Sequence, residues 1–446
     1  MNRLLWTLSL GVFTGALDLS VLSPALPALG RELHVATSDL AWVFTLYLLV
    51  TVVSIALAST LADRYGRRPV YLACLSLFAA GSVLAIVAPS YPIFLAARAI
   101  QALGAGGIFP VATATIGDVV PAARRGAALG IVAATWGLAA VIGPSIGGLV
   151  THFISWRWIF AANVPLAAVV FALALRDVPT EAPRRREPLD VLGLGLLCIG
   201  LLGLMDGLIA MRPIIGVIGV FILAAFWIWE TLSDAPIVPL ALLQSRQLVR
   251  TYVLEILIGV LEGSLFFIPT VLVGAQGLSY AAAGFVAALG AFVFVAVIPY
   301  SGRALDRIGS RDVLLFGAIL TEVGLALFAL GFQSLPLALL AMVVAGAGFG
   351  ALLGAPTRYI VTNETPRRAR GTAVGLLSQA LIVGQIVGSS LAGGLFGLGT
   401  TEISGYRNAY LAFCGVAFLA LLLAATLKPQ RDERRRPIEE AAAGAL

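Results

Sequence analysis

A ten-residue stretch that joins two apolar segments occurs twice in this chain, as PAARRGAALG at residues 121–130 and as PRRARGTAVG at residues 366–375. The second copy begins 245 residues after the first. Another motif, DRYG at residues 63–66, recurs as DRIG at residues 306–309, 243 residues later. Because both motifs keep their order and nearly the same offset, the sequence predicts a chain built from two related halves.

The segments around these motifs are strongly apolar. Hydrophobic residues make up 60% of the 446 positions and charged residues 12%, and the mean hydropathy is +0.99. A soluble chain carries far more charge, so lipid must be the solvent for most of these side chains. Windows of about twenty apolar residues, bounded by charges or Pro/Gly turns, predict fourteen membrane spans. The expected spans are 4–29, 39–61, 69–88, 91–118, 125–150, 157–176, 189–211, 213–232, 249–273, 280–301, 311–331, 335–361, 370–397 and 406–427.

The basic residues are distributed unevenly between the two sides of the expected membrane. With the N-terminus inside, cytoplasmic segments hold 24 Lys and Arg residues, outer segments hold four, and Arg98 lies within a span. The positive-inside rule predicts this bias, which also accounts for the net charge of +6 without a nucleic-acid partner. The first apolar segment is too long for a cleavable signal. We therefore expect both termini in the cytoplasm.

The repeat and the span count together define an architecture. The first six spans end near residue 176, and a shift of about 244 residues leaves spans seven and eight outside both halves. We expect a six-helix half at 1–176, two extra transmembrane helices at 177–248, a second six-helix half at 249–427 and a basic cytoplasmic tail at 428–446. Both halves start inside, so the repeat is parallel, with its axis along the membrane normal.

Several motifs resemble signatures of the major facilitator superfamily. Residues 59–68 are similar to its signature between spans two and three, and residues 98–104 to the fourth-span signature of proton-coupled members. Residues 130–148 resemble the fifth-span antiporter signature, one glycine short. The run WRWIF at 156–160, followed by Asn163-Val-Pro165, is a further match.

The resemblance covers nearly the whole chain. Ser59 and Ala102 stand where the family commonly has glycine, and both are small enough for close helix packing. With fourteen spans, the resemblance implies a drug:proton antiporter with the major facilitator fold, an all-α integral membrane protein of two pseudo-symmetric six-helix bundles plus two extra helices. It implies a proton-driven, cofactor-free exporter of hydrophobic or cationic small molecules, a monomer among the lipids of a bacterial cell membrane.

Other functions fit the sequence less well. A lipid or amphiphile exporter of the same fold is the close alternative, and the antiporter signature counts against a proton-coupled uptake symporter. An enzyme or metal site would need polar clusters, but the only histidines, His34 and His152, lie at the expected outer edge and the three cysteines lie in apolar stretches. No GxxxxGK[ST] run is present to bind ATP phosphates.

Ionisable residues deep in membrane spans are costly and therefore mark functional sites. Asp18 lies near the middle of span one, and Glu262 takes the equivalent place in span nine, 244 residues later; we expect the two to face a central cavity. Arg98 has no basic counterpart in the second half, so we expect it to pair with Asp18, for proton coupling or as a static ion pair. Glu255, two helix turns before Glu262, is expected to relay protons or to pair with Arg250.

Two groups of residues are expected to serve the conformational change. The resemblance implies a latch between the halves, with a plain turn as the alternative; it comprises Asp63, Arg64, Gly66, Arg67, Arg68, Asp306, Arg307 and Gly309. The antiporter motif permits a kink and close backbone approach, either as a sealed pivot or as ordinary packing; it comprises Gly130, Gly143, Pro144, Gly147 and Gly148.

Some polar and aromatic residues are candidates for lining a substrate cavity, where a tryptophan would stack on a flat cation. They are Tyr47, Gln101, Trp136, Gln379 and Gln385. An ordinary packing role is the alternative for this set.

Asp206 and Arg212 are expected to pair locally at the outer end of the extra helices. Glu322 has no evident partner in the sequence, and its role is left open.

Overall fold

The computed structural model describes residues 2–180, 190–233, 237–238, 240–243, 245–366 and 369–430. These residues are mostly helical and include fourteen helical segments long and apolar enough to cross a membrane. The expected all-α fold with fourteen spans is therefore confirmed. The arginines at 184–186 and 367–368, and the expected tail from residue 431 on, lie outside the described residues.

The helices follow the chain in three groups. The first group is α1 (Asn2–Val21), η1 (Ser23–Ala25), α2 (Leu26–Glu32), α3 (Ala41–Tyr65), α4 (Arg67–Val87), α5 (Tyr91–Val119), α6 (Ala122–Phe153) and α7 (Arg157–Asp177). The second is α8 (Val191–Ile209), α9 (Pro213–Leu232) and η2 (Leu240–Leu243). The third is α10 (Arg246–Leu265), α11 (Ile268–Gln276), α12 (Tyr280–Ile308), α13 (Ser310–Gly331), α14 (Leu335–Leu352), α15 (Pro356–Glu364), α16 (Arg370–Gly397) and α17 (Glu402–Ala425).

Three of the spans are broken, each beside a proline. The chain passes from α1 to α2 through η1, which contains Pro24. Pro269 lies in the first turn of α11, and Pro356 in the first turn of α15. Proline lacks an amide N–H and its ring collides with the preceding turn, so a helix tends to stop before it. The segments 4–29, 249–273 and 335–361, expected as continuous spans, are therefore each divided into shorter helices.

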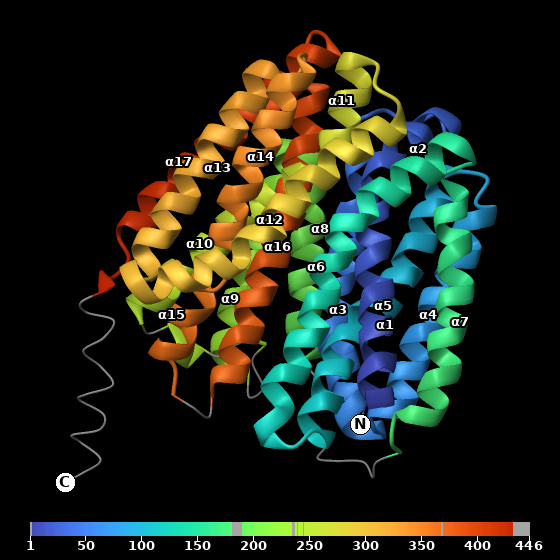
Figure 1. Ribbon diagram of the computed structural model, residues 1–446, viewed down its shortest axis with the longest axis vertical. Helices are drawn as coiled ribbons and strands as arrows, with labels where there is room; N and C mark the ends of the chain where they lie inside the picture. The colour runs from blue at the N-terminus through green and yellow to red at the C-terminus, as the bar shows by residue number, and fades with distance from the viewer. Residues whose placement is uncertain are drawn as a thin grey trace. The chain divides into compact units, whose positions relative to one another are not determined.

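The helices gather into two compact units. Unit 1 contains Met1–Ile237, Phe266–Ala288 and Ser389–Leu398, and unit 2 contains Val238–Leu265, Leu289–Gly388 and Gly399–Leu446. Within unit 1, α4 packs on α5 and α7, and α1 packs on α6 and α7 (Figure 1). Within unit 2, α13 packs on α14 and α17. The division of the chain at residues 176 and 248, expected from the repeat, stays a prediction.

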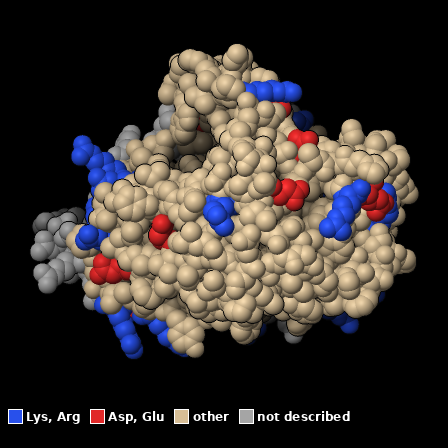
Figure 2. Space-filling view, turned by 90° about the horizontal axis from the view of Figure 1, so that it is seen from above, with Lys and Arg blue, Asp and Glu red and all other residues tan. Residues whose placement is uncertain are grey.

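The exterior carries large apolar side chains. On α9, Ile214, Phe221 and Leu232 are 76%, 70% and 71% exposed. In the end-on view of Figure 2, charged side chains form small separate groups, and other residues make up most of the visible surface. Lipid solvates such large apolar side chains readily, whereas water does not.

Asp190, just before the start of α8, ties the ends of the α8–α9 hairpin together. Its carboxylate accepts hydrogen bonds from the Gly193 amide over 2.8 Å, the Trp229 indole over 2.9 Å and the Ser233 hydroxyl over 3.0 Å. Burial acts to raise the pKa of Asp190, but these three hydrogen bonds outweigh it and hold the pKa below its ordinary value. Asp190 is therefore the N-cap of α8 and also binds the C-terminal end of α9.

Asp190→Ala should lower the stability of the purified protein near pH 7 by about 1 kcal/mol, the usual cost of losing such a cap. Because folding lowers the pKa of this carboxyl group, its contribution is complete above the ordinary aspartate pKa of about 4 and is lost as the pH falls through the lowered value. Thermal unfolding followed by tryptophan fluorescence should show the variant and the parent converging on acidification. A difference that stays constant with pH would contradict this role.

Candidate functional site

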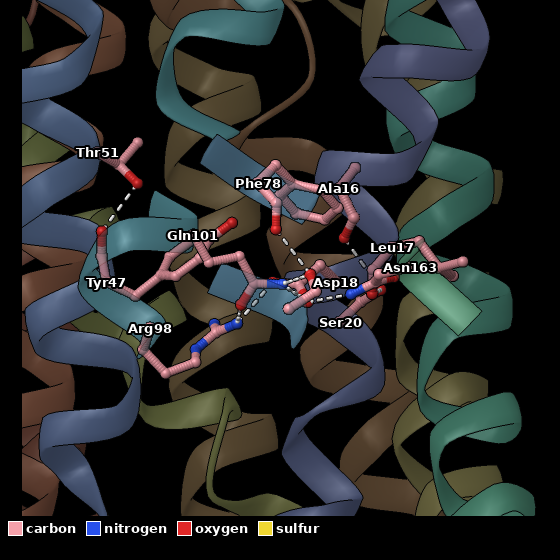
Figure 3. A network of polar contacts seen from close by, with 11 residues as sticks. Ala16, Leu17, Asp18, Ser20, Tyr47, Thr51, Phe78, Arg98, Gln101 and Asn163 are labelled. Atoms are coloured by element: carbon pink, nitrogen blue, oxygen red, sulfur yellow. Dashed lines mark hydrogen bonds and ion pairs between the residues drawn. The ribbon is translucent and has the colours of Figure 1, made fainter. Parts of the chain in front are cut away.

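A buried ionic network joins α1, α4, α5 and α7 of unit 1 around Asp18 (Figure 3). Asp18 and Arg98 have no exposed surface, and Arg98 Nη1 donates to Asp18 Oδ2 over 2.7 Å, so the expected pair is present. Gln101 Nε2 and Asn163 Nδ2 both donate to Asp18 Oδ1, over 2.8 and 2.7 Å. Three N–H donors thus satisfy the carboxylate, as a buried charge requires.

Gln101 fixes the orientation of the groups around Asp18. Its Oε1 accepts from Arg98 Nη1 over 2.5 Å, while its Nε2 also donates to Ser82 Oγ over 2.9 Å. Ser82 Oγ in turn donates to the Phe78 carbonyl over 2.8 Å. Because a guanidinium only donates, the amide oxygen of Gln101 must face Arg98. Gln101, a candidate for lining a cavity, is fully buried in this network.

Aromatic rings surround the rest of the Arg98 guanidinium. Its Cζ lies 4.1 Å from the centroid of the Tyr47 ring and 5.7 Å from that of the Phe160 ring. A desolvated cation–π contact contributes about 2 kcal/mol. Arg98 Nε and Nη2 have no hydrogen-bond partner among the described residues. The charge of Arg98 is therefore stabilised by one carboxylate, one amide and two rings.

Close packing of α5 on α4 places Arg98 and Gln101 at this depth. A Cβ atom on Gly81 of α4 would lie 2.7 Å from the Ala97 carbonyl oxygen and 2.7 Å from Gln101 Cα. Side-chain carbon atoms do not approach a backbone so closely, so only glycine fits. The helix turn that carries both network residues is thus in direct contact with the α4 backbone.

Unit 2 has a simpler polar contact at the position equivalent to Asp18. Gln385 Nε2 donates to Glu262 Oε2 over 2.9 Å, and Gln385 is 8% exposed. The contact is held by glycines, because a Cβ atom on Gly259 of α10 would lie 2.9 Å from Gly384 Cα of α16. Two of the predicted site residues, Glu262 and Gln385, are therefore in contact. The partner of Glu262 is an amide, whereas Asp18 forms an ion pair with an arginine. The expected placement of Asp18 and Glu262 at one central cavity stays a prediction.

Glu255 lies in a different environment on α10. It is 5% exposed, and its Oε2 has no hydrogen-bond partner among the described residues. Arg250, the expected ion-pair partner of Glu255, donates to the Thr426 carbonyl over 2.5 Å. Thr357 and Arg358 of α15 lie beside Glu255. Its role as a proton relay stays a prediction.

The glycines of the antiporter-like motif bring α6 against α1. A Cβ atom on Gly143 would lie 2.7 Å from Ser20 Cβ, and one on Gly147 would collide with the carbonyl group of Val21. Gly130 of the same motif has no such neighbour within 4 Å in the described part of the chain. Gly143 and Gly147 therefore need glycine for close packing against α1, whereas Gly130 has room for a side chain.

Two further residues of this motif meet the start of α12 in unit 1. A Cβ atom on Gly148 would lie 3.2 Å from Ala281 Cα, and one on Gly284 would lie 3.2 Å from the carbonyl carbon of Pro144. Pro144 lies inside α6 without ending it. The predicted close backbone approach is present, whereas a pivoting role stays a prediction.

The first DRYG-type motif makes its contacts within unit 1. Gly66 has φ of 97°, a conformation that favours glycine. Arg67 pairs with Asp63 over 2.7 Å and with Asp118 of α5 over 3.2 Å. Arg68 donates to the Thr180 hydroxyl over 2.9 Å. The motif thus ties α3, α4 and α5 together, and the latch between halves stays a prediction.

The second copy has the same backbone shape but different partners. Gly309 has φ of 87°. Gln430 Nε2 donates to the carbonyl oxygens of Asp306 and Arg307, over 3.4 and 3.1 Å. In the first copy, the Arg64 guanidinium lies 5.3 Å from the Tyr65 ring centroid. The positive φ shared by both copies explains why each motif ends in glycine.

The remaining candidates are scattered. Trp136 is 46% exposed and meets the edge of Phe109, with ring centroids 5.9 Å apart, and Gln379 is half-buried. Arg212 and Asp206 form the expected pair over 3.5 Å. Glu322 is half-buried, and its Oε2 has no hydrogen-bond partner within the described part of the chain.

Two members of the Asp18 network are not among the residues that sequence reasoning selects. Asn163 is an amide inside an apolar span, and the motif Asn163-Val-Pro165 was its only signal. Ser82 gives no signal, because small hydroxyl residues are common in membrane helices and bond to their own backbone. Among the described residues, no group of three or more His, Cys, Asp or Glu side chains is placed to hold a metal ion.

Comparison with known proteins identifies the family. The sequence profile of the Major Facilitator Superfamily matches residues 8–241 and 256–445. The chain is 33% identical to "Uncharacterized MFS-type transporter YfiU" of Bacillus subtilis, over 93% of this chain and 84% of the relative. It is 30% identical to "Multidrug resistance protein Stp" of Mycobacterium tuberculosis, over 86% and 74% of the two chains. It is also 30% identical to "Tetracenomycin C resistance and export protein" of Streptomyces glaucescens, over 87% and 74%.

Solved structures agree with these sequence matches at the level of the fold. The crystal structure of a D-xylose-proton symporter superposes with a TM-score of 0.72 at 17% identity, over 97% of this chain and 99% of that one. A nucleoside transporter superposes with a TM-score of 0.69 at 16% identity, over 94% and 98%. The chain is therefore a multi-pass membrane transporter that belongs to the major facilitator superfamily.

Proposed function

We propose that this transporter is a proton-coupled antiporter that exports hydrophobic or cationic small molecules by alternating access. The observation that carries the proposal is the Asp18–Arg98 pair, fully buried inside the membrane-spanning part of unit 1. A charged pair in this position is costly and needs a functional reason. A carboxylate that exchanges a proton while its arginine partner stays charged provides one.

In this mechanism the proton alters the electrostatic balance around Arg98. With Asp18 ionised, the pair is neutral as a whole and its contacts hold α1 to α5. When Asp18 binds a proton, Arg98 loses its counter-charge and the conformations of the transporter change in relative free energy. A substrate that binds one conformation better than the other is then coupled to proton movement.

The direction of transport is inferred from the motif and the relatives. Residues 130–148 resemble the antiporter signature, and two relatives at 30% identity are named for multidrug resistance and for export of tetracenomycin C. The fourteen spans favour the drug:proton antiporter branch with that span count. We propose further that the transporter is a monomer in the bacterial cell membrane, that both of its termini lie in the cytoplasm and that it needs no cofactor.

A screen in inverted vesicles tests direction, coupling and cargo together. Vesicles with an imposed pH gradient should release protons when an exported compound is added, and vesicles without the protein should not. Hydrophobic cations, neutral drugs and fluorescent lipids form the three arms. Proton uptake together with substrate would identify a symporter, and a response to lipids alone would identify a lipid exporter; either result would overturn the proposal.

Glu262→Gln should weaken export of permanently charged cations such as ethidium by at least about tenfold in apparent affinity, because removing the carboxylate that faces a cation in a low-dielectric site costs about 1.4 kcal/mol or more. Export of a neutral compound should change little. The concentration dependence of both, measured in the same vesicles, checks this expectation. Glu322→Gln makes the same chemical change in a span outside the site and is the matched control. Equal losses in the two variants, or no loss in either, would remove Glu262 from the site.

A further inference from the structure

Tyr47 adds α3 to the network around Asp18. Its hydroxyl donates a hydrogen bond to the Asp18 carboxylate, because an ionised carboxylate only accepts. Its ring faces the guanidinium of Arg98, whose Cζ lies 4.1 Å from the ring centroid, and both residues lie on the same side of Asp18 in the view of Figure 3. Tyr47, a candidate for lining a substrate cavity, is 3% exposed. It therefore contacts both charges of the buried pair.

The same turn of α3 packs on segments from the expected second half of the chain. These segments belong to unit 1 and are Phe266–Ala288 and Ser389–Leu398. Phe44 stacks on Phe266, with ring centroids 4.5 Å apart and 19° between the ring planes. Thr45 and Ser389, both without exposed surface, share a hydrogen bond between their hydroxyl groups over 2.8 Å. Phe44 and Thr45 lie within one helix turn of Tyr47, so this turn contacts both the Asp18 network and the two segments.

These contacts are closely packed. The Phe267 ring lies edge-on to Phe44 and to Phe396, with centroids 6.1 and 5.6 Å away. A Cβ atom on Gly393 of α16 would lie 2.6 Å from the carbonyl oxygen of Ser38, shortly before α3. A shift of α3 must therefore break several contacts at once. We call this set the α3 closure; it comprises Phe44, Thr45, Phe266, Phe267, Ser389 and Phe396.

We propose that Tyr47 is a positioning residue that links the charge on Asp18 to the α3 closure. With Asp18 ionised, the Tyr47 hydroxyl holds α3 in the arrangement in which the closure is formed. The inference rests on the proposed function, in which Asp18 binds the transported proton. It adds the contact through which that proton acts on the packing of another helix.

The hydrogen bond from Tyr47 depends on the charge of Asp18. A hydrogen bond to an ionised acceptor is about twice as strong as one between neutral groups, so protonation of Asp18 weakens it. Since the closed arrangement provides this donor, it favours ionised Asp18, and proton binding shifts the equilibrium toward opening of the closure. By linkage, opening favours proton binding to the same extent. Because the start of α3 is expected at the outer face, the proton is expected to reach Asp18 from outside.

Asp18 is the group in this network that can lose its charge on acidification. Arg98 of α5 and Tyr47 of α3 are the titratable groups that face it, and a guanidinium and a phenol both keep their protons at neutral and acidic pH. The other groups around this turn of α1 are neutral, and they are Gln101 of α5, Ser82 of α4, Asn163 of α7 and the Ala139 carbonyl of α6. A pH-dependent movement of α3 at Tyr47 therefore reports on Asp18.

The test measures the α3 closure as a distance. Nitroxide labels are attached at Asp39→Cys, just before α3, and at Leu398→Cys, just after α16; both positions are exposed and belong to unit 1. Alanine replaces the native cysteines, which are Cys74, Cys198 and Cys414. Double electron–electron resonance on the full-length protein in lipid nanodiscs should give one short distance at mildly alkaline pH and a second, longer distance on acidification. Asp18→Asn should show the longer distance at both pH values.

Tyr47→Phe keeps the ring beside Arg98 and removes the O–H donor. At alkaline pH the ratio of the longer to the shorter distance should rise about fivefold over the labelled parent, the effect of losing one hydrogen bond, and its change with pH should shrink. Tyr71→Phe is the matched control, because it makes the same change at a fully buried position of unit 1. The Tyr71 hydroxyl lies against Gly11 of α1 and has no hydrogen-bond partner among the described residues, so this variant should behave as the parent.

The link is wrong if the parent distance does not depend on pH, if Asp18→Asn keeps the pH dependence, or if Tyr47→Phe behaves as the parent. An equal change in Tyr71→Phe would also contradict it, because that hydroxyl does not touch Asp18. The measurement uses neither a substrate nor a proton gradient, so these results are distinct from a failure of proton-coupled export in vesicles.

Discussion

Asp18→Asn is expected to abolish proton-driven export while leaving the chain folded. The amide has nearly the volume of the carboxyl group, so the packing of α1 is kept, but it has no proton to exchange in the physiological range. Arg98 keeps its charge with no counter-charge in a site that is 0% exposed. Breaking a buried pair from one side costs about 3 kcal/mol or more, so the variant should also unfold at a lower temperature. Transport in proteoliposomes should fall to that of protein-free liposomes.

A second variant separates lost coupling from lost stability. Asp18→Asn combined with Arg98→Gln removes both charges, so the thermal stability should recover while export stays absent. Asp18→Glu keeps a carboxyl group and should retain part of the activity with an altered pH dependence. If Asp18→Asn alone still exports against a proton gradient, Asp18 does not couple transport to protons. A static ion pair would then be the correct reading of the Asp18–Arg98 contact.

The sequence predicts the fold well because lipid imposes a simple rule. A span needs about twenty apolar residues, and that rule alone identifies all fourteen spans. It does not locate breaks within a span. Pro24 lies in a short 3-10 helix between α1 and α2, whereas Pro144 stays inside α6. Apolar residues lie on both sides of each proline, so the difference depends on packing that a single sequence does not display.

The sequence predicts the charged pair of the site but not all of its polar partners. The cost of burying a charge identifies Asp18 and Arg98 and requires that they meet. Gln101 follows three positions after Arg98, so the two share a helix face. Asn163 lies on another helix, and nothing in the apolar pattern shows which face of α7 turns toward α1. Trp136 was chosen by residue type alone and is 46% exposed. Residue type does not show which face of a helix a side chain lies on.

Gly147→Ala should disrupt transport even though it adds a single methyl group. The new Cβ atom would lie 2.9 Å from Val21 Cα and 2.7 Å from the Val21 carbonyl carbon. Val21 is the last residue of α1, three positions after Asp18. Backbone atoms cannot move aside as a flexible side chain would, so α6 and α1 must separate. Such overpacking costs about 1–3 kcal/mol, and under the proposed function the displaced end of α1 would carry Asp18 away from its partners.

Gly130→Ala is the control, because it makes the same change in the same helix and the same motif. Among the described residues, no atom outside its own helix turn lies within 4 Å of the added Cβ. Alanine is a better helix former than glycine by about 1 kcal/mol, so this variant should be at least as stable as the parent and should transport normally. The same propensity gain is present in Gly147→Ala, so a fall in its unfolding temperature would mean that the packing cost exceeds it. We expect export below about a tenth of the parent for Gly147→Ala, which corresponds to about 1.4 kcal/mol. If the two variants export equally well, the close contact of α6 with α1 is ordinary helix packing that transport does not need.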